Sequence, residues 1–207
     1  MAERPAALAR ENPFRASRLE SLRFRLSPAG WNRLLERWAA HGYRGALVGP
    51  HGSGKTTLLD EIAARRSSGR AVRLRFSTEK RGLSGADRRL VEKVGPRDLV
   101  TVDGAEQLGP WGWRRLRRGL RPAGAVLVTA HRPGFLPTIH RHAASPELLA
   151  ELVAELMGDE VPGRSPRQTL EWSPRLAAEL PRLYARHRGN LRECFFELYS
   201  RWAEGGI

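Results

Sequence analysis

The middle of the chain alternates short apolar runs with longer amphipathic stretches, and this alternation predicts a sheet flanked by helices. One run, residues 71–76, alternates apolar and polar side chains as a half-buried strand does. Another, residues 125–130, is apolar almost throughout, which is typical of a parallel strand covered on both faces. Two more strands are predicted at residues 45–48 and 98–103. Because segments with helical spacing fill the gaps between strands, we expect an α/β fold.

The N-terminal part of the chain precedes this alternation. Its first 26 residues alternate arginine with apolar side chains and predict no regular element. Ser27 and Pro28 then form a helix start, with the serine as N-cap and the proline in the first turn. The helix that follows has an apolar stripe that predicts packing on a core. The stripe residues are Trp31, Leu34, Leu35, Trp38 and Ala39.

The last third of the chain has the spacing of helices. Residues 138–143 fit either a short edge strand or a turn of helix. Ser-Pro pairs at positions 145 and 173 each open a helix, and Asn190 caps a third one. A loop rich in Pro, Gly and Ser, residues 161–167, separates the first two. We predict three parts: an N-terminal leader and helix (1–43), a core (44–143) and a C-terminal helical lid (144–207).

Composition narrows the class of protein. The 207 residues suffice for one α/β domain with a small appendage. The sequence has no apolar run of 18 residues and no apolar signal sequence at its start, so we expect a soluble, cytoplasmic protein without a membrane partner. The lone Cys194 excludes an internal disulfide. His140 and His142 would share one face of a strand, but no further ligand completes a zinc site.

The formal net charge of +14 raises the question of a nucleic-acid partner. Only three of the 36 basic residues are lysines, and an arginine bias of this kind also arises from a GC-rich genome. Residues 110–121 form a basic helix that starts with Trp111 and Trp113, and this mixture suits nucleic acid. A solvated helix face is the commoner origin of such a pattern. The outer-face arginines are Arg114, Arg115, Arg117 and Arg118.

The clearest chemical signal is the segment Gly49-Pro50-His51-Gly52-Ser53-Gly54-Lys55-Thr56-Thr57, which fits the phosphate-loop (Walker A) pattern G-x-x-x-x-G-K-[ST]. Its glycines allow consecutive backbone N–H groups to turn inward on an anion. Lys55 supplies positive charge to the outer phosphates, and the Thr56 hydroxyl suits Mg²⁺. An apolar strand precedes the segment and a helix follows it, as the pattern requires. The sequence therefore predicts a nucleoside triphosphate site, without separating ATP from GTP.

Polar residues at the ends of two later strands are candidates for the rest of this site. Asp103 ends its strand and would hold Mg²⁺ opposite Thr56. Glu106 is a candidate general base for an attacking water, although a glutamate in a first helical turn also has a purely electrostatic explanation. Further residues at the end of the strand at 125–130 lie where they can reach the terminal phosphate. They are Thr129, His131 and Arg132.

On these motifs the chain resembles additional-strand P-loop ATPases, close to the AAA+ and STAND-type groups. The resemblance covers about residues 40–200 and includes the run Gly189-Asn190-Leu191-Arg192-Glu193. It implies ATP and Mg²⁺ as ligands, and a three-layer core with a mainly parallel sheet of order 5-1-4-3-2. It also implies that Thr129 is the first sensor and that Arg192, in the helical lid, senses the γ-phosphate. The whole chain further resembles bacterial ATP-binding proteins whose substrates are not established.

The chain departs from this resemblance at one position. Typical AAA+ proteins have a glutamate directly after the Mg²⁺ aspartate, whereas this chain has Gly104. The run Asp103-Gly104-Ala105-Glu106 is closer to that of NACHT-like STAND proteins, which implies slow or partner-dependent hydrolysis. The family also implies an arginine finger that acts on a neighbouring subunit, for which Arg132 and Arg141 are candidates.

Four functions fit the sequence. The first is a Mg²⁺-dependent ATPase that acts as a switch or motor on a macromolecular partner, either another protein or further copies of this chain. The second is a DNA-dependent ATPase that assists replication or transposition and binds DNA through the basic helix at 110–121. The third is a P-loop kinase for a small acceptor. The fourth is a nucleotide-binding scaffold that hydrolyses little.

Overall fold

The computed structural model describes residues 9–65, 69–158 and 174–205, which form two units. The helical unit contains, as far as they are described, the residues up to Leu22, the loop segment Pro50–Ser53 and the residues from Ala143 onward. The sheet unit contains Arg23–Gly49 and Gly54–His142. The predicted loop at 161–167 and the predicted cap Ser173 lie outside the described residues. The division at residues 43 and 143 stays a prediction.

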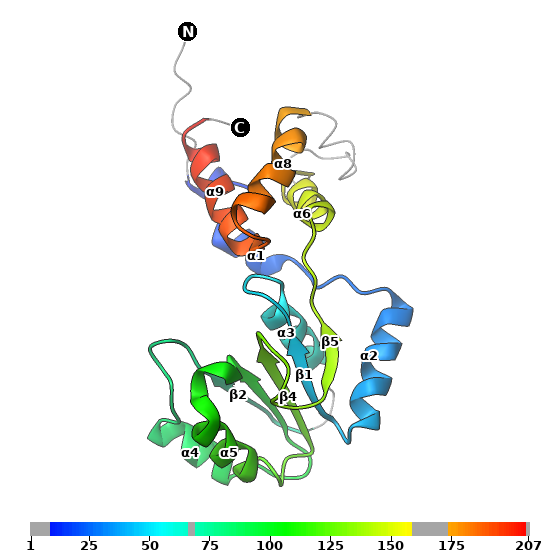
Figure 1. Cartoon of the computed structure of the whole chain (residues 1–207), viewed down its shortest axis with the longest axis vertical. Coiled ribbons are helices and arrows are strands. Elements are labelled where there is room, and N and C mark those ends of the chain that lie inside the picture. Colours follow the sequence, from blue (N-terminus) through cyan, green and yellow to red (C-terminus); the bar gives the residue numbers. More distant parts are fainter. Residues whose placement is uncertain (1–8, 66–68, 159–173, 206–207) are drawn as a thin grey trace. The chain divides into compact units, whose positions relative to one another are not determined.

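A five-stranded parallel sheet forms the centre of the sheet unit (Figure 1). The strand order is β2-β3-β4-β1-β5, which is the expected order 5-1-4-3-2 counted from the other edge. The segment that fitted either strand or helix is therefore strand β5. The strands are β1 (Arg44–Val48), β2 (Ala71–Arg75), β3 (Leu99–Asp103), β4 (Ala125–Ala130) and β5 (Thr138–Arg141).

The position of each strand in the sheet follows its apolar pattern. All six residues of the central strand β4 are buried, as are the first four of β3. Strand β2, at one edge, alternates exposed and buried positions, as predicted for a half-buried strand. Side chains of a continuous apolar strand need cover on both faces, whereas an alternating strand can leave one face in water.

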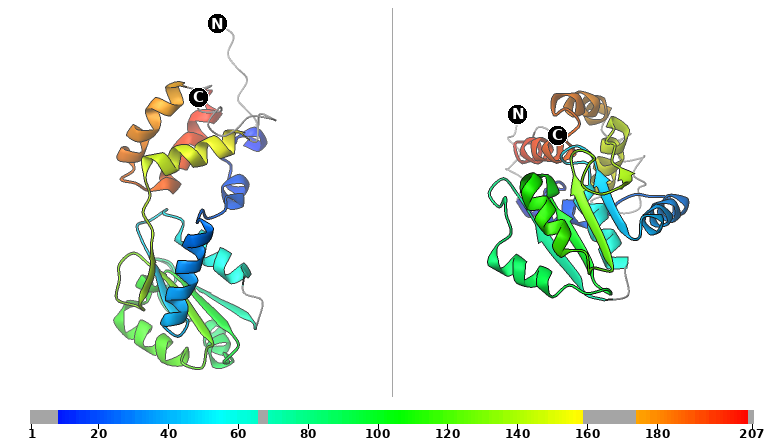
Figure 2. Two further views of the ribbon diagram at one scale, coloured as in Figure 1. Left: turned by 90° about the vertical axis from the view of Figure 1, so that its right-hand side faces the viewer. Right: turned by 60° about the horizontal axis from the view of Figure 1, so that its bottom comes forward.

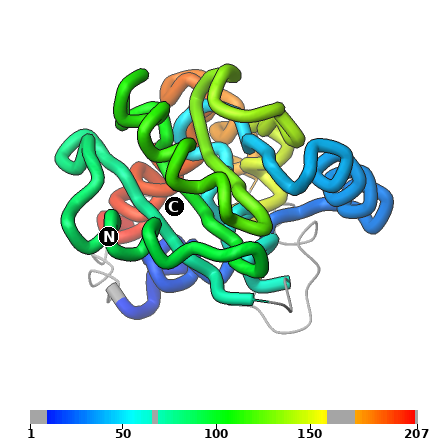
Figure 3. The backbone as a smooth tube through the Cα atoms, turned by 90° about the horizontal axis from the view of Figure 1, so that it is seen from below, coloured from blue at the N-terminus to red at the C-terminus, as the bar shows by residue number. Residues whose placement is uncertain are grey.

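Helices cover both faces of the sheet and give three layers (Figure 2). The helices are α2 (Pro28–Ala40), α3 (Lys55–Arg65), α4 (Gly85–Glu92), the 3-10 helix η2 (Ala105–Leu108) and α5 (Gly109–Gly119). One face packs against α2 and α3, and the other against α4, η2 and α5. Figure 3 traces this path from below, with α2 in blue at the right.

Helix α2 covers less of the core than its sequence predicts. Leu34 and Trp38 are buried, whereas Leu35 and Ala39 are exposed. Helix α2 packs mainly on β1 and β5, at the edge of the sheet, so only a narrow stripe of it is buried. Trp38 Nε1 also donates to the backbone oxygen of Val126 on β4. Its predicted start is confirmed, since the Ser27 side chain accepts a hydrogen bond from the backbone of Gly30.

The helical unit joins both ends of the described chain. Its elements are η1 (Ala9–Glu11), α1 (Ala16–Ser21), α6 (Pro146–Gly158), α8 (Pro174–Arg186) and α9 (Leu191–Ala203). The sequence predicted no regular element before residue 27, and this prediction was wrong, because η1 and α1 lie there. Phe14 explains the miss, because it is buried against Phe195 and Trp202, which no local pattern reveals. The predicted cap of α9 is confirmed, with Asn190 accepting from Glu193 N.

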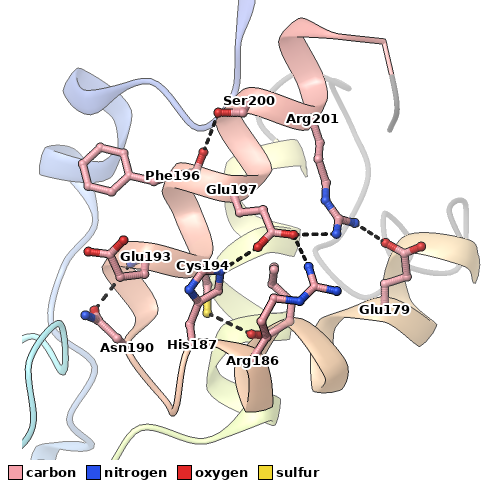
Figure 4. Close-up of polar contacts among 11 residues, drawn as sticks. Glu179, Arg186, His187, Asn190, Glu193, Cys194, Phe196, Glu197, Ser200 and Arg201 are labelled. Carbon is pink, nitrogen blue, oxygen red and sulfur yellow. Dashed lines mark hydrogen bonds and ion pairs between the residues drawn. The ribbon is translucent and has the colours of Figure 1, made fainter.

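Polar contacts around Glu197 join α8 to α9 (Figure 4). The Glu197 carboxylate binds Arg186, His187 and Arg201, and Arg201 also reaches Glu179 on α8. The hydrogen bonds from His187 and Arg201 hold the pKa of Glu197 below its usual value, although partial burial acts in the opposite direction. In the described parts of the chain, no helix is long and apolar enough to cross a membrane.

Candidate functional site

The carboxyl ends of β1, β3 and β4 bring together the polar side chains that the sequence singles out. Lys55 and Thr56 open α3, after the loop that follows β1. Asp103 ends β3, and Thr129 is the last residue but one of β4. Because these strands are parallel, their carboxyl ends lie at one edge, where open α/β sheets bind ligands.

Lys55 is held within the phosphate loop itself. Its Nζ donates a hydrogen bond to the backbone oxygen of Gly49 at 2.9 Å, and the side chain is almost fully buried. Burial lowers the pKa of Lys55, while the charges of Glu106 and Asp103 act to raise it. Gly54 has a φ of +81°, in the left-handed region that favours glycine.

Asp103 is fixed by two hydroxyl groups. Thr56 Oγ1 lies 3.2 Å from both Oδ1 and Oδ2 of the carboxylate. Thr129 Oγ1 donates to Asp103 Oδ1 at 2.7 Å and accepts from the backbone N–H of Gly104 at 2.9 Å. Thr129 therefore connects the ends of β3 and β4 and sets the orientation of the carboxylate. A hydroxyl and a carboxylate this close are oxygen donors of the kind that Mg²⁺ prefers, so the residues present fit this ion.

Two arginines on β2 approach the same carboxylate, and the sequence analysis missed them. Arg73 NH2 and Arg75 Nε each lie 3.8 Å from Asp103 Oδ2. Arg73 also pairs with Asp60 on α3, at 2.7 Å. Both arginines occupy alternate exposed positions of β2, and Arg75 stands opposite Asp103 in the register. The alternation was visible in the sequence, but the register of β2 against β3 was needed to find the contact.

Glu106 and His131 form a pair beside these residues. Glu106 lies in η2 and His131 directly follows β4, and their Oε1 and Nε2 atoms are 2.7 Å apart. Less than a quarter of either side chain is exposed. Both residues were candidates from the sequence, but their contact was not foreseen because it depends on how η2 places Glu106 beside the end of β4. The pair places an oriented carboxylate near the carboxyl ends of β3 and β4.

Gly104 occupies a position that a side chain cannot enter. Its φ is +79°, and a Cβ built there would lie 2.5 Å from the backbone oxygen of Phe76. Phe76 is held in place because its N–H donates to the backbone oxygen of Asp103. A glutamate at position 104, directly after the aspartate, therefore requires the backbone to move.

Other predicted site residues are not brought into this cluster by contacts within the sheet unit. Arg192 lies in the first turn of α9, in the helical unit, and its sensor role stays a prediction. Ser53 donates to the backbone oxygen of Pro50 within the loop. Arg132 and Arg141 are exposed, and the assignment of an arginine finger stays a prediction. Among the described residues, no group of three or more His, Cys, Asp or Glu side chains could hold a metal ion. The ring centroids of His140 and His142 lie 4.7 Å apart.

The basic helix α5 has the predicted orientation with one correction. Leu116 and Leu120 are buried, but so is Trp113, which packs edge-on against Phe135. Only Trp111 is available to a partner, with 82% of its surface exposed and the guanidinium of Arg114 6.0 Å from its ring. Within the described chain, no ion pair or hydrogen bond engages the four outer arginines. These are Arg114, Arg115, Arg117 and Arg118.

Comparison with known proteins gives a likeness of fold. No family model matches the chain, and no curated protein does. The structure is similar to that of a RuvB variant from Thermotoga maritima, with a TM-score of 0.51 and 16% identity over 82% of this chain and 59% of that one. It is less similar to PCH-2 from C. elegans, with a TM-score of 0.38 and 14% identity over 84% of this chain and 67% of that one.

The chain thus spans 59% of the length of the RuvB structure. At such low identity the likeness concerns the fold alone. The sheet order and the helices on both faces are like those of AAA+ P-loop domains, and this is the fold class expected from the sequence.

Proposed function

We propose that this protein binds ATP at the carboxyl ends of β1, β3 and β4, hydrolyses it with Mg²⁺, and acts as a switch or motor on a macromolecular partner. The observation that carries the proposal is the meeting of the Thr56 hydroxyl with the Asp103 carboxylate at 3.2 Å, directly after a phosphate loop. A glycine-rich turn without function would have no need of a carboxylate from another strand. This contact is the arrangement that triphosphate and Mg²⁺ require.

Lys55 and the loop backbone would bind the phosphates. In the structure the Lys55 ammonium donates to Gly49 O, a neutral acceptor, in a buried setting. A phosphate oxygen is a stronger acceptor for a cation than a carbonyl is, so exchange of one for the other favours binding. The positive end of α3 acts in the same direction, since Lys55 is the first residue of this helix.

Thr56 and Asp103 would hold Mg²⁺, with Thr129 as the positioning residue. Bound there, Mg²⁺ would supply positive charge that stabilises the charge developing on the transferred phosphoryl group. The Thr129 hydroxyl fixes Asp103 Oδ1 from β4, so the carboxylate needs little reorganisation on binding. This role adds to the sensor role that the family resemblance implies for Thr129.

Glu106 is the proposed general base for the attacking water. Gly104 leaves no room for a carboxylate directly after Asp103, and Glu106 is the next acid along the chain. The His131 ring contacts the Glu106 carboxylate through Nε2, which restricts the orientation of that carboxylate. A general base acts only within hydrogen-bond reach of its proton, so such restriction sets the rate of water activation.

Calorimetric titration of the full chain with MgATP and MgGTP tests the nucleotide site. We expect Lys55→Ala to weaken ATP binding at least about a hundredfold, because a buried, charge-assisted contact with phosphate is lost. Lys93→Ala is the matched control, since Lys93 is an exposed lysine at the end of α4 and should leave binding unchanged. Undiminished ATP binding by the Lys55 variant would overturn the assignment. Comparison of the affinities for MgATP and MgGTP shows which base the site prefers.

Mg²⁺ use is tested by steady-state turnover against Mg²⁺ concentration. Asp103→Asn keeps the shape of the side chain but removes its charge, so we expect turnover to fall by at least about a hundredfold at any Mg²⁺ concentration. Glu106→Gln should lower turnover while ATP affinity stays within about twofold. Equal turnover of wild type and Glu106→Gln would remove Glu106 from the mechanism and leave ATP binding untouched.

The exposed face of α5 favours DNA as the partner. Its four unpaired arginines and the exposed Trp111 combine charge for phosphates with a ring for bases. We expect duplex or single-stranded DNA to raise ATP turnover at low salt. Replacing the four arginines by alanine should abolish this stimulation, whereas Arg88→Ala plus Arg89→Ala on α4 should retain most of it. Flat turnover with and without DNA would rule out this partner and leave a protein partner or self-assembly.

Arg192 is proposed to report the γ-phosphate from the lid, and Arg132 or Arg141 to act on a neighbouring copy. Arg192→Ala should lower turnover more than ATP affinity. If an arginine finger acts between copies, turnover per chain should rise with protein concentration. Arg132→Ala or Arg141→Ala should then remove that rise, whereas turnover independent of concentration would contradict an active oligomer.

A further inference from the structure

The sheet unit contains a second candidate binding site, in a cavity between α2 and β5. Its volume is about 430 Å³, and it contains none of the phosphate-loop residues. That size is in the range of pockets that hold small organic molecules. It is lined by Leu26, Gly30, Arg33, Leu34, Arg37, Thr138, Ile139, His140 and Arg141.

The polar lining of this cavity is cationic. Arg33, Arg37 and Arg141 are all exposed, and within the described residues no ion pair engages any of them. Arg33 and Arg37 are four residues apart on α2, so their like charges face each other across one helical turn. No aspartate or glutamate belongs to the lining. Three arginines and no carboxylate therefore line one cavity, and a bound anion would relieve the repulsion among their charges.

His140 adds a polar group that is neutral in this setting. Burial lowers the pKa of His140, and the charge of Arg37 lowers it further. Its ring is held edge-on by Phe24, with 5.8 Å between ring centroids, and by His142 at 4.7 Å. A neutral, positioned imidazole offers a hydrogen bond to a ligand without adding to the repulsion among the arginines.

The floor of the cavity is apolar. Leu34 and Ile139 are buried, and Leu26 is half-buried beside them. A bare inorganic ion would leave this surface and most of the volume unused. A ligand with an anionic group and a carbon body would use both the arginines and the apolar floor.

We propose that this cavity binds a phosphorylated small molecule, with the phosphate on Arg33, Arg37 and Arg141 and the organic body against Leu34 and Ile139. A phosphate ester carries close to two negative charges at neutral pH, which matches three guanidinium groups better than a single carboxylate does. Guanidinium groups also bind phosphate in a bidentate manner. The site is separate from the phosphate loop, and the proposal does not rest on ATP hydrolysis.

Calorimetry on the full chain tests the ligand class, with the phosphate loop saturated by a non-hydrolysable ATP analogue and, in parallel, in the Lys55→Ala variant. The probes are AMP and glucose 6-phosphate, with adenosine, glucose and inorganic phosphate as controls. We expect one or both esters to bind at least about tenfold more tightly than inorganic phosphate, and adenosine and glucose not to bind. The two esters distinguish a nucleotide from a sugar phosphate. Absence of binding by both at 5 mM, roughly the weakest affinity worth calling specific, would overturn the proposal.

A pair of variants locates the binding. Arg33→Ala plus Arg37→Ala should weaken ester binding at least about tenfold, because two charge-assisted contacts are lost. Arg88→Ala plus Arg89→Ala removes the same charge from α4 and should change binding less than about twofold. An equal loss in both variants would mean attraction to general surface charge and would overturn the site. Arg141→Ala, from the opposite wall, should also weaken binding, and thermal unfolding of each variant checks that the fold is retained.

Discussion

The sheet unit and the helical unit are built on different contact patterns. In the sheet unit, strands and helices alternate along the chain. Strand β1 pairs with β4, and β2 with β3, in an unbroken register, whereas the register of β1 against β5 shifts between Ala46 and Leu47. In the helical unit, the first described residues pack on the last ones. Asn12 Nδ2 donates to the backbone oxygen of Tyr199 at 2.9 Å across 187 positions of sequence. Phe14 stacks on Phe195, with ring centroids 6.5 Å apart.

This difference in contacts predicts which property a substitution in each unit should disturb. In the sheet unit, the polar contacts of the candidate site lie at the ends of β3 and β4, so a substitution there should disturb chemistry more than packing. The helical unit depends on a few long-range contacts of Asn12 and Phe14, so a substitution there should first disturb packing. The cluster of Thr56, Asp103 and Thr129 belongs to the sheet unit and should stay intact. The following substitutions test this contrast.

Phe14→Ala should have the largest effect. Phe14 is 1% exposed, and removal of its ring leaves a cavity against α9, which costs about 3–5 kcal/mol of the unfolding free energy. Cys194 reports on the same core, because it is fully buried and burial raises the pKa of its thiol to about 11. At pH 8 the folded protein should therefore react slowly with iodoacetamide, since the thiolate is the nucleophile. The variant should react much faster, whereas Phe196→Ala, at an exposed position, should not.

Thr129→Val should have the next largest effect on the unfolding free energy, and it acts on the sheet unit. It removes the hydroxyl that binds both Asp103 Oδ1 and Gly104 N. Buried groups left without this partner cost about 1–3 kcal/mol of the unfolding free energy. The Mg²⁺ concentration for half-maximal turnover should rise, because the Asp103 carboxylate is no longer oriented. Thr129→Ser keeps the hydroxyl, and a similar loss in this variant would contradict a hydrogen-bonding role.

Asn12→Ala should destabilise the helical unit moderately. The side chain donates to Tyr199 O, and its Oδ1 accepts from the backbone N–H of Phe14. Loss of these two hydrogen bonds should cost about 1–2 kcal/mol, measured by urea unfolding. Turnover at saturating ATP should stay close to that of the wild type at temperatures where the variant is folded. A large loss of ATP binding by the folded variant would mean that the packing of the helical unit, which contains Pro50–Ser53, also sets the phosphate loop.

Arg75→Ala should have the smallest effect. Its guanidinium lies 3.8 Å from Asp103 Oδ2, but 65% of its side chain is exposed. Solvent screens such a contact, so ATP affinity should change less than about twofold in calorimetry. A tenfold change would mean that Arg75 contacts the nucleotide itself.

The sequence predicted the features that depend on local patterns. The loop at Lys55, the serine cap of α2 and the polar ends of β3 and β4 are all readable within a few residues. The sheet order came from a family resemblance and is confirmed. What the sequence could not predict depends on register or on distant contacts. Arg75 reaches Asp103 because the register of β2 against β3 puts the two residues opposite each other. Helix α1 has only six residues and lies in a segment anchored by Phe14.

Gly104 also limits how this site can change over evolution. Many P-loop ATPases of the type it resembles have an acid at that position, and a single codon change from glycine can give glutamate. Here the left-handed backbone and the 2.5 Å approach to Phe76 O make that change unfavourable by itself. A lineage that gained the acid would first need a different turn after β3. One nucleotide change can give glutamate at position 104, but the backbone would also have to change through further substitutions. Selection would therefore more readily act on Glu106 and its partner His131.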